Sequence, residues 1–195
     1  MGYETGQFGK NHLGDLNRFL PCAHGFDEFF GYLDRLDALP DPYWFDYPQD
    51  WIDKTGPRNL IHCWTTDTND TTSMPQWGPV GKGRLKMRGR SRILHILGMP
   101  NWQKGRPAKY DMKPSDEVLL QHTNGFMDKA KKDDKPFFIW HNTTRMHVFT
   151  YISPKYQAMM NYDTNYNLEE AGMAQVDDCI GSFCSISRTL ARQTT

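Results

Sequence analysis

The chain has 195 residues, with 23 lysines and arginines against 23 aspartates and glutamates, and 13% of its residues are aromatic. This length suits one domain, the aromatic content suits a packed core, and the balanced charge argues against a dominant nucleic-acid-binding surface. No apolar run approaches the roughly 18 residues that a membrane span needs. The four cysteines form no CxxC pair, which disfavours a zinc ribbon and predicts scattered, partly buried thiols.

The first half of the chain predicts short strands separated by irregular segments. Residues 2–8 end as a strand would, in a glycine-rich turn over 9–14. Residues 26–33, FDEFFGYL, are expected to cover a sheet edge, and residues 60–66, LIHCWTT, to form another strand. Residues 67–114 are interpreted as one long loop insertion, of the kind found on substrate-facing surfaces or in disordered inserts.

A helix is predicted to begin at Ser115, which is placed to cap it. Acidic residues follow in its first turn and lysines lie in its last turn, an order that suits the helix dipole. Its apolar stripe consists of Leu119, Phe126, Met127 and Ala130.

The rest of the chain predicts a strand and a second helix. The apolar run FFIWH over residues 137–141 is expected to be a buried parallel strand. The second helix is predicted from about residue 168, and Asp177 and Asp178 on it are expected to form caps or salt bridges rather than a metal site. Its apolar face is expected to consist of Leu168, Val176, Ile180, Phe183 and Leu190. The pattern predicts an α/β fold.

The turn GKNHLGD projects two polar side chains, Lys10 and His12, from the end of the first strand. A P-loop is excluded because it needs a glycine where the chain has Glu4 and a serine or threonine where it has Asn11. An ammonium and an imidazole together suit a tetrahedral oxyanion. The alternative is a polar loop without a ligand, which is the commoner outcome for such a short stretch.

A second polar stretch, NTTRMHV, follows the strand predicted over 137–141. Open α/β sheets build their sites at this end of their strands. His147 is a candidate general acid or base, and Arg145 is a candidate contact for an anion. His141 is expected to be a core histidine with a hydrogen-bonded ring. The basic stretch over 82–92 suits an anionic substrate or, more commonly, a solvated loop.

Four segments of the chain, in the same order, resemble sulfatases and above all the bacterial arylsulfatase branch. The resemblance covers about residues 2–83 and 115–183, and GKxHLG together with the later MHV histidine is far more specific than either motif alone. The segments are GYETGQFGKNHLGDLNRFLPCAHGFDEFFGYL, GPRNLIHCWTTDTNDTTSMPQWGPVGK, KPFFIWHNTTRMHVFT and MAQVDDCIGSF.

The resemblance implies an alkaline-phosphatase-like fold, with a mostly parallel sheet flanked by helices and long irregular loops, and hydrolysis of a sulfate ester. In this family a formylglycine beside a calcium ion attacks the sulfur. Lys10 is similar to the lysine that contacts the sulfate oxygens, and His12 to the histidine that bonds the formylglycine hydroxyl. His147 is similar to the histidine that protonates the departing alcohol, and Arg145 joins Lys10 and His147 as an expected substrate contact. The implied substrate is a sulfated small molecule or glycan, and the implied location is periplasmic or secreted.

The formylglycine motif C/S-x-P-x-R occurs nowhere in the 195 residues. The family's acidic pair that binds calcium is expected before Met1, and its later Asp-Asn or Asp-His metal pair is expected beyond Thr195. We therefore expect an internal fragment, with a partial catalytic domain over 1–195 that includes the 67–114 insertion and a divergent tail over 184–195. The alternatives are a catalytically inactive sulfatase-like remnant and an anion- or carbohydrate-binding module. Neither nucleic acid nor a membrane is an expected partner.

Overall fold

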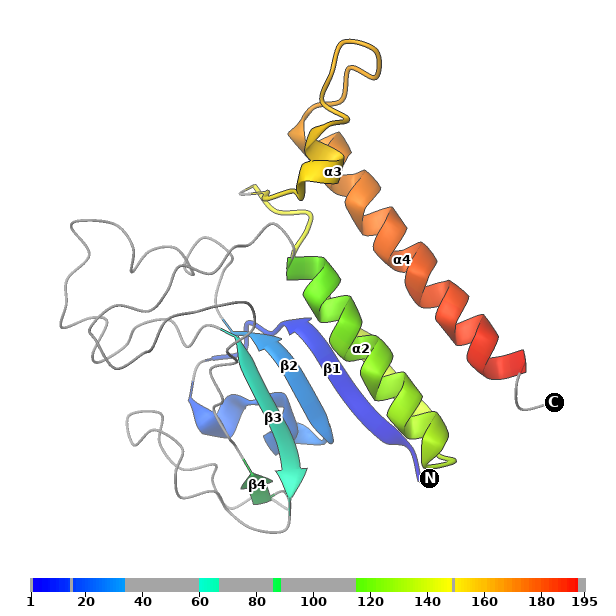
Figure 1. The fold of residues 1–195 in the computed structure, drawn as a ribbon. Coiled ribbons are helices and arrows are strands. Elements are labelled where there is room, and N and C mark those ends of the chain that lie inside the picture. Colours follow the sequence, from blue (N-terminus) through cyan, green and yellow to red (C-terminus); the bar gives the residue numbers. More distant parts are fainter. Residues whose placement is uncertain are drawn as a thin grey trace, which may run out of the picture.

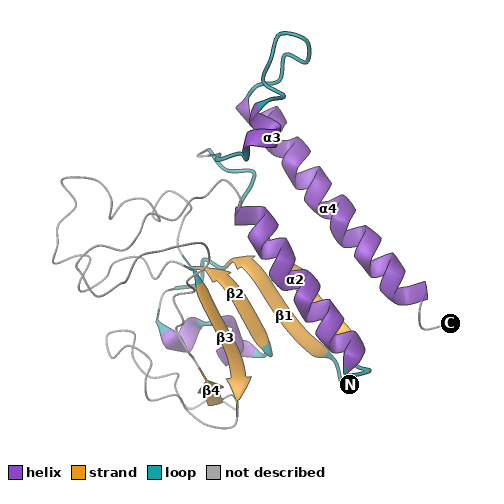
Figure 2. Cartoon of the chain, viewed as in Figure 1, coloured by secondary structure: helices purple, strands orange, loops and turns teal. Residues whose placement is uncertain are grey.

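The computed structural model describes residues 2–14, 16–33, 60–66, 86–88, 115–148 and 150–192. Within these ranges the chain forms one sheet with helices packed against it, so the predicted α/β class is confirmed (Figures 1 and 2). Most of the insertion predicted over 67–114 lies outside the described residues, as do the last three residues of the predicted tail.

The sheet combines parallel and antiparallel neighbours in the order β4-β3-β2-β1-β5. Strands β2, β1 and β5 are parallel to one another, whereas β3 is antiparallel to β2 and β4 is antiparallel to β3. The mostly parallel sheet that we expected is therefore a parallel trio extended by two antiparallel strands. The strands are β1 (Glu4–Lys10), β2 (Glu28–Tyr32), β3 (Ile61–Thr66), β4 (Lys86–Arg88) and β5 (Phe137–His141).

Strand β4 lies inside the stretch that the sequence analysis interpreted as a loop. Its residues 86–88 pair with β3, and they belong to the basic segment over 82–92. A basic residue at every second position of that segment matches the side-chain period of a strand. The interpretation as a solvated loop is therefore wrong for these three residues.

Close packing at the carboxyl ends of the parallel strands requires glycine. A Cβ on Gly31 of β2 would lie 1.8 Å from the carbonyl oxygen of Gly9, and a Cβ on Gly9 would lie 1.8 Å from that of Asn142. Gly9 also has a φ of 107°, which disfavours other residues. Strand β1 ends at Lys10, two residues later than the sequence predicted. Its last residues lie close to the backbone of β2 and of the segment after β5.

Helix α2 (Ser115–Lys132) covers one face of the sheet, across β1 and β2 (Figure 1). Its predicted apolar stripe is confirmed, because all four residues are buried. The core on this side consists of Phe8, Phe30, Val118, Leu119 and Phe126. In it the rings of Phe8 and Phe126 pack edge to face at 5.5 Å between centroids.

Helix α4 (Leu168–Arg192) lies alongside α2 (Figure 1). It begins where the sequence predicts, and its helical course continues through most of the tail that we expected to diverge. The predicted apolar face is only partly correct: Val176 is buried, but Ile180 and Leu168 are exposed. The buried stripe is turned toward α2 and the short helix α3 (Pro154–Gln157), and it includes Ala171, Gln175 and Cys179.

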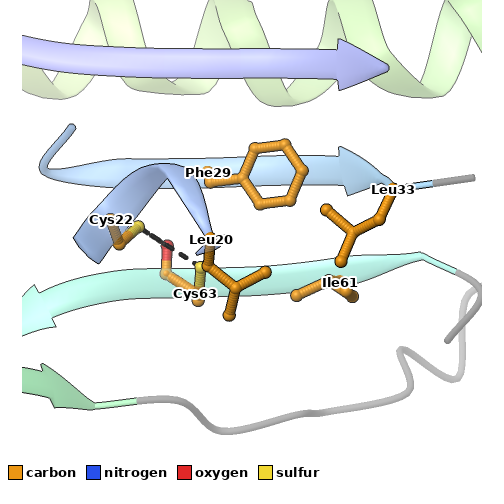
Figure 3. Packing of buried hydrophobic residues seen from close by; sticks show 6 residues of the cluster. All are labelled: Leu20, Cys22, Phe29, Leu33, Ile61 and Cys63. Atoms are coloured by element: carbon orange, nitrogen blue, oxygen red, sulfur yellow. Dashed lines mark hydrogen bonds between the residues drawn. The ribbon is translucent and has the colours of Figure 1, made fainter. Parts of the chain in front are cut away.

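Two short 3-10 helices, η1 (Asn17–Phe19) and η2 (Pro21–His24), pack beside β2 and β3. Successive strand residues point to opposite faces, so Phe29 faces this side of the sheet while Phe30 faces α2. The cluster here consists of Leu20, Cys22, Phe29, Leu33, Ile61 and Cys63 (Figure 3). The prediction that residues 26–33 cover a sheet edge is therefore wrong: β2 is an internal strand, buried on both faces.

Strand β5 is parallel, as predicted, but it is not buried. It pairs with β1 and lies at the edge of the described sheet. Phe137 and Ile139 pack toward the α2 core, whereas Phe138 and Trp140 on the other face are 50% and 54% exposed. A continuous apolar run predicts cover on both faces, and among the described residues only one face has it.

Candidate functional site

The turn after β1 directs its side chains in two directions. Asn11 is buried, its backbone N–H donates to the carbonyl of Tyr32 at 2.8 Å, and its side-chain oxygen accepts the N–H of Leu13 at 3.1 Å. His12 is exposed and Lys10 is half-buried. Asn11 therefore anchors the turn to β2, and the lysine and histidine on either side of it are presented outward.

Lys10 and His12 lie at one cavity with residues from the end of β5. Because β1 and β5 are parallel, with Phe8 opposite His141, their carboxyl ends lie at the same edge of the sheet. The cavity has a volume of about 620 Å³. It is lined by Lys10, His12, His141, Asn142, Thr143, Arg145, Val176 and Ile180.

Asn142 holds the two strand ends together. Its backbone N–H donates to the carbonyl of Phe8 at 2.7 Å, and its side-chain amide donates to the carbonyl of Lys10 at 2.8 Å. The indole N–H of Trp140 donates to its side-chain oxygen at 3.0 Å. These contacts fix the backbone from which Lys10 projects. The sequence pattern does not indicate this role, although Asn142 opens the NTTRMHV stretch.

Arg145 has a different setting from the one the sequence suggested. Its guanidinium is fully buried and forms an ion pair with Asp116 in the first turn of α2. It also donates to the carbonyl of Tyr151, and Asp116 accepts the N–H of Thr144 at 2.6 Å. Arg145 contributes to the cavity lining, but its charge is already balanced by a buried carboxylate. These contacts tie the loop that follows β5 to helix α2. An anion contact by Arg145 stays a prediction.

His141 is hydrogen-bonded, as predicted, and it also faces the cavity. Its Nδ1 lies 2.8 Å from the hydroxyl of Thr123, and that hydroxyl lies 2.9 Å from the carbonyl of Leu119. Burial lowers the pKa of His141, which favours the neutral ring. When the threonine hydroxyl donates to Leu119, the Nδ1–H of His141 donates to the threonine, and Nε2 remains an acceptor.

His147 is half-buried, two residues beyond Arg145, and it is not among the described residues that line the cavity. Its carbonyl accepts the hydroxyl of Thr150, which is also 3.2 Å from a carboxylate oxygen of Glu169 at the start of α4. The role of His147 as an acid stays a prediction. Lys10, His12 and Arg145 are thus brought to one cavity, together with His141, Thr143 and Ile180, which were not predicted as site residues.

The sheet flanked by helices agrees with the fold that the family resemblance implies. A model of the sulfatase family matches residues 1–186. The chain belongs to the sulfatase family. No curated protein matches it.

Solved sulfatase structures share the fold. The PsFucS1 sulfatase from Pseudoalteromonas sp. superposes with a TM-score of 0.62 at 21% identity, over 97% of this chain and 33% of that one. Ps i-CgsB gives a TM-score of 0.52 at 19% identity, over 97% and 34%. BT33336S-sulf, from the glycosaminoglycan metabolism of Bacteroides thetaiotaomicron, gives 0.55 at 16%, over 97% and 40%. The chain thus spans about a third of the length of the first two, and its fold is alkaline-phosphatase-like.

The described residues do not fit a calcium site. No group of three or more histidine, cysteine, aspartate or glutamate side chains gathers among them in a way that could hold a metal ion. Asp178, one of the acidic pair on α4, forms a salt bridge with Lys155 and accepts a hydrogen bond from the hydroxyl of Tyr156. The predicted salt bridge is therefore present at this residue. In the part of the chain that the structure describes, no helix is long and apolar enough to cross a membrane.

Proposed function

We propose that this chain carries the sulfate-holding part of the active site of an arylsulfatase-like sulfuric ester hydrolase. The observation that supports this most directly is the position of Lys10 and His12 at one cavity with the carboxyl ends of β1 and β5. In sheets with parallel strands this edge is where ligands bind. The sulfatase family supports the reaction class, and the cavity supports the choice of Lys10 and His12. His147, which is not among the described residues that line the cavity, is included only on the family resemblance.

The chemistry needs cationic and acidic groups near the sulfate. A sulfate ester carries a negative charge, and further charge develops on the bridging oxygen as the bond from sulfur to the alcohol breaks. The ammonium of Lys10, which lines the cavity, stabilises the sulfate oxygens. The imidazole of His12 donates a hydrogen bond to the same group. His147 gives its proton to the departing alcohol.

The nucleophile and the cation lie outside this account. The family's formylglycine has no C/S-x-P-x-R sequence here, and the described residues offer no calcium site. We therefore limit the mechanism to binding and proton transfer by the chain's own side chains. We expect the 195-residue chain alone not to turn over an aryl sulfate.

The substrate class that we propose is a sulfated small molecule or glycan. The relation of BT33336S-sulf to glycosaminoglycan metabolism supports the glycan. The second candidate function is an anion- or carbohydrate-binding module without catalysis. Lys10 and His12 at the cavity would supply the anion contact in this candidate as well.

A binding experiment tests the proposal. Calorimetric titration with 4-nitrophenyl sulfate is expected to give an affinity that falls at least tenfold in Lys10→Ala, a loss of about 1.4 kcal/mol or more. Lys129→Ala serves as control, because Lys129 pairs with Glu4 and Asp133 and is not among the residues that line the cavity. An equal affinity in wild type and Lys10→Ala would contradict the proposal. Binding of an unsulfated glycan with the same affinity as its sulfated form would favour the second candidate.

A further inference from the structure

Two cysteines that are 41 residues apart in the sequence meet in the core between η2 and β3. The sulfur atoms of Cys22 and Cys63 are 3.3 Å apart, and the Cys22 thiol also lies 3.2 Å from the carbonyl of Cys63 (Figure 3). Their exposed fractions are 0% and 1%. The prediction of scattered thiols is therefore wrong for this pair, because the fold brings two distant strand and helix residues together.

The surroundings hold the two thiols at this distance. The side-chain hydroxyl of Thr65 on β3 lies 2.7 Å from the carbonyl of Phe26 and 3.2 Å from that of Cys22. These contacts fix η2 against the strand on one side. Apolar side chains of the same cluster, including Leu20 and Phe29, close the other side (Figure 3). A disulfide needs a sulfur separation of about 2.05 Å, so the two atoms would have to approach by about 1.2 Å.

We propose that Cys22 and Cys63 are a site of covalent modification, at which an intrachain disulfide ties η2 to β3. The oxidant is a small-molecule or protein disulfide. The thiolate of one cysteine attacks a sulfur of the oxidant. This forms a mixed disulfide between that cysteine and the attacked half of the oxidant, and the other half leaves as a thiol. The second cysteine then attacks the protein sulfur of that mixed disulfide, and a second thiol leaves. Two electrons pass to the oxidant, and the protons of the two cysteines end on its thiols.

The burial of the pair decides when this reaction occurs. Desolvation, together with the neighbouring thiol of Cys63, raises the pKa of Cys22 well above its usual range. The thiolate is the reactive form, so the folded protein protects the pair from an oxidant. We expect the bond to form while the chain folds or opens, when η2 is not yet packed on β3. The other two cysteines, Cys179 and Cys184, both lie on α4, five residues apart and on different faces of the helix.

The disulfide would constrain the segment next to the candidate site. Residues 11–14 of the Lys10 turn lead into η1 and η2, and Asn11 is bonded to the end of β2. A bond between positions 22 and 63 closes a loop that contains β2. Such a loop restricts the unfolded chain, and we expect the melting temperature to rise by about 10 °C. The inference does not depend on the proposed sulfate site.

The experiment uses the Cys179→Ala/Cys184→Ser variant, in which only the proposed pair remains. The protein is unfolded in urea and refolded with oxidised and reduced glutathione, and its free thiols are counted under denaturing conditions. We expect the count to fall from two to zero, peptides containing Cys22 and Cys63 to be joined in non-reducing mass spectra, and the melting temperature to rise until a reductant is added.

The wild-type chain provides the second measurement, because it requires no substitution to be tolerated. There we expect two of four thiols to be lost and the joined peptides to be those of Cys22 and Cys63. Cys63→Ala is expected to abolish the joined peptide. Two free thiols remaining in the variant, a joined peptide that contains Cys179 or Cys184 in wild type, or an unchanged or lower melting temperature on oxidation would overturn the proposal.

Discussion

The guanidinium of Arg145 and the carboxylate of Asp116 form an ion pair in which both side chains are fully buried. The pair joins the loop after β5 to the first turn of α2, and Asp116 also accepts the N–H of Thr144. The loop therefore owes its position to a residue that belongs to the helix, 29 positions earlier in the chain.

We expect Asp116→Ala to lower the free energy of unfolding by about 3–5 kcal/mol, because it leaves a buried guanidinium without its counter-charge. Urea unfolding followed by circular dichroism measures the change. Asp178→Asn is the control: it removes a carboxylate that pairs with Lys155 on the surface and should leave stability almost unchanged. A loss below 1 kcal/mol in Asp116→Ala would show that the pair does not hold the loop.

Gly9→Ala is expected to disrupt the carboxyl end of β1. The new Cβ would lie 1.8 Å from the carbonyl oxygen of Asn142, and the φ of 107° is unfavourable for alanine. We expect a large loss of stability together with loss of sulfate binding. Gly125→Ala on the exposed side of α2 provides the contrast, since nothing lies within 4 Å of its Cβ. Gly125→Ala should raise the free energy of unfolding by about 0.5–1 kcal/mol. If both substitutions changed the stability by a similar amount, the close approach of Gly9 to Asn142 would be contradicted.

His122 predicts a pH dependence of stability. Its ring stacks on Phe30 at 3.5 Å between centroids, and burial, with a smaller effect of His62, lowers its pKa to about 4; Glu28 opposes this shift. Between about pH 6.5 and 4 the unfolded chain holds a proton at this position that the folded chain lacks. Stability is therefore full above pH 6.5 and falls as the pH drops toward 4.

The effect of His122 is expected to be about 1–2 kcal/mol, which is less than the roughly 3.4 kcal/mol of the full shift because the ring is partly exposed. Urea unfolding at a series of pH values measures it. His122→Phe keeps the stacking and should flatten the profile between pH 4 and 6.5. The same slope in His122→Phe as in wild type would exclude His122 as its source.

The edge that β5 forms in the described sheet is expected to promote self-association. Phe138 and Trp140 are each at least half exposed there, and an open strand edge with apolar side chains favours pairing between molecules. Phe138→Lys/Trp140→Lys should lower the sedimentation coefficient of the purified chain toward that of a monomer. Val148→Lys changes an apolar residue outside the strands that is even more exposed, at 80%, and should have little effect. A monomeric wild-type chain at high concentration would refute this expectation.

The sequence predicts well those elements whose signals are local. The helix from Ser115 shows caps, charge order and an apolar stripe within one segment, and β1 and β3 lie close to their expected positions. The errors concern partners that are distant in the chain. Whether FFIWH is internal or at an edge depends on what covers Phe138 and Trp140, and the run itself contains no such information.

The candidate site shows the same division. Lys10 and His12 are visible as an unusual pair between glycines, and the site lies where a strand ends. Asn11 and Asn142 lie within the two polar stretches, but neither stretch predicts their anchoring role, because their partners include backbone carbonyls of other strands. Arg145 shows what the sequence does not reveal: its position suggests an anion contact, which stays a prediction, but its buried counter-ion comes from α2.

The central claim is that Lys10 and His12 bind the sulfate group at the carboxyl ends of β1 and β5. Amide and histidine NMR spectra recorded during titration with 4-nitrophenyl sulfate test it most directly. We predict concentration-dependent shifts at Lys10, His12 and Asn142, little change at His122, and loss of these shifts in Lys10→Ala. Unchanged signals at Lys10 and His12, or shifts that gather instead around His122 and Lys129, would contradict the claim.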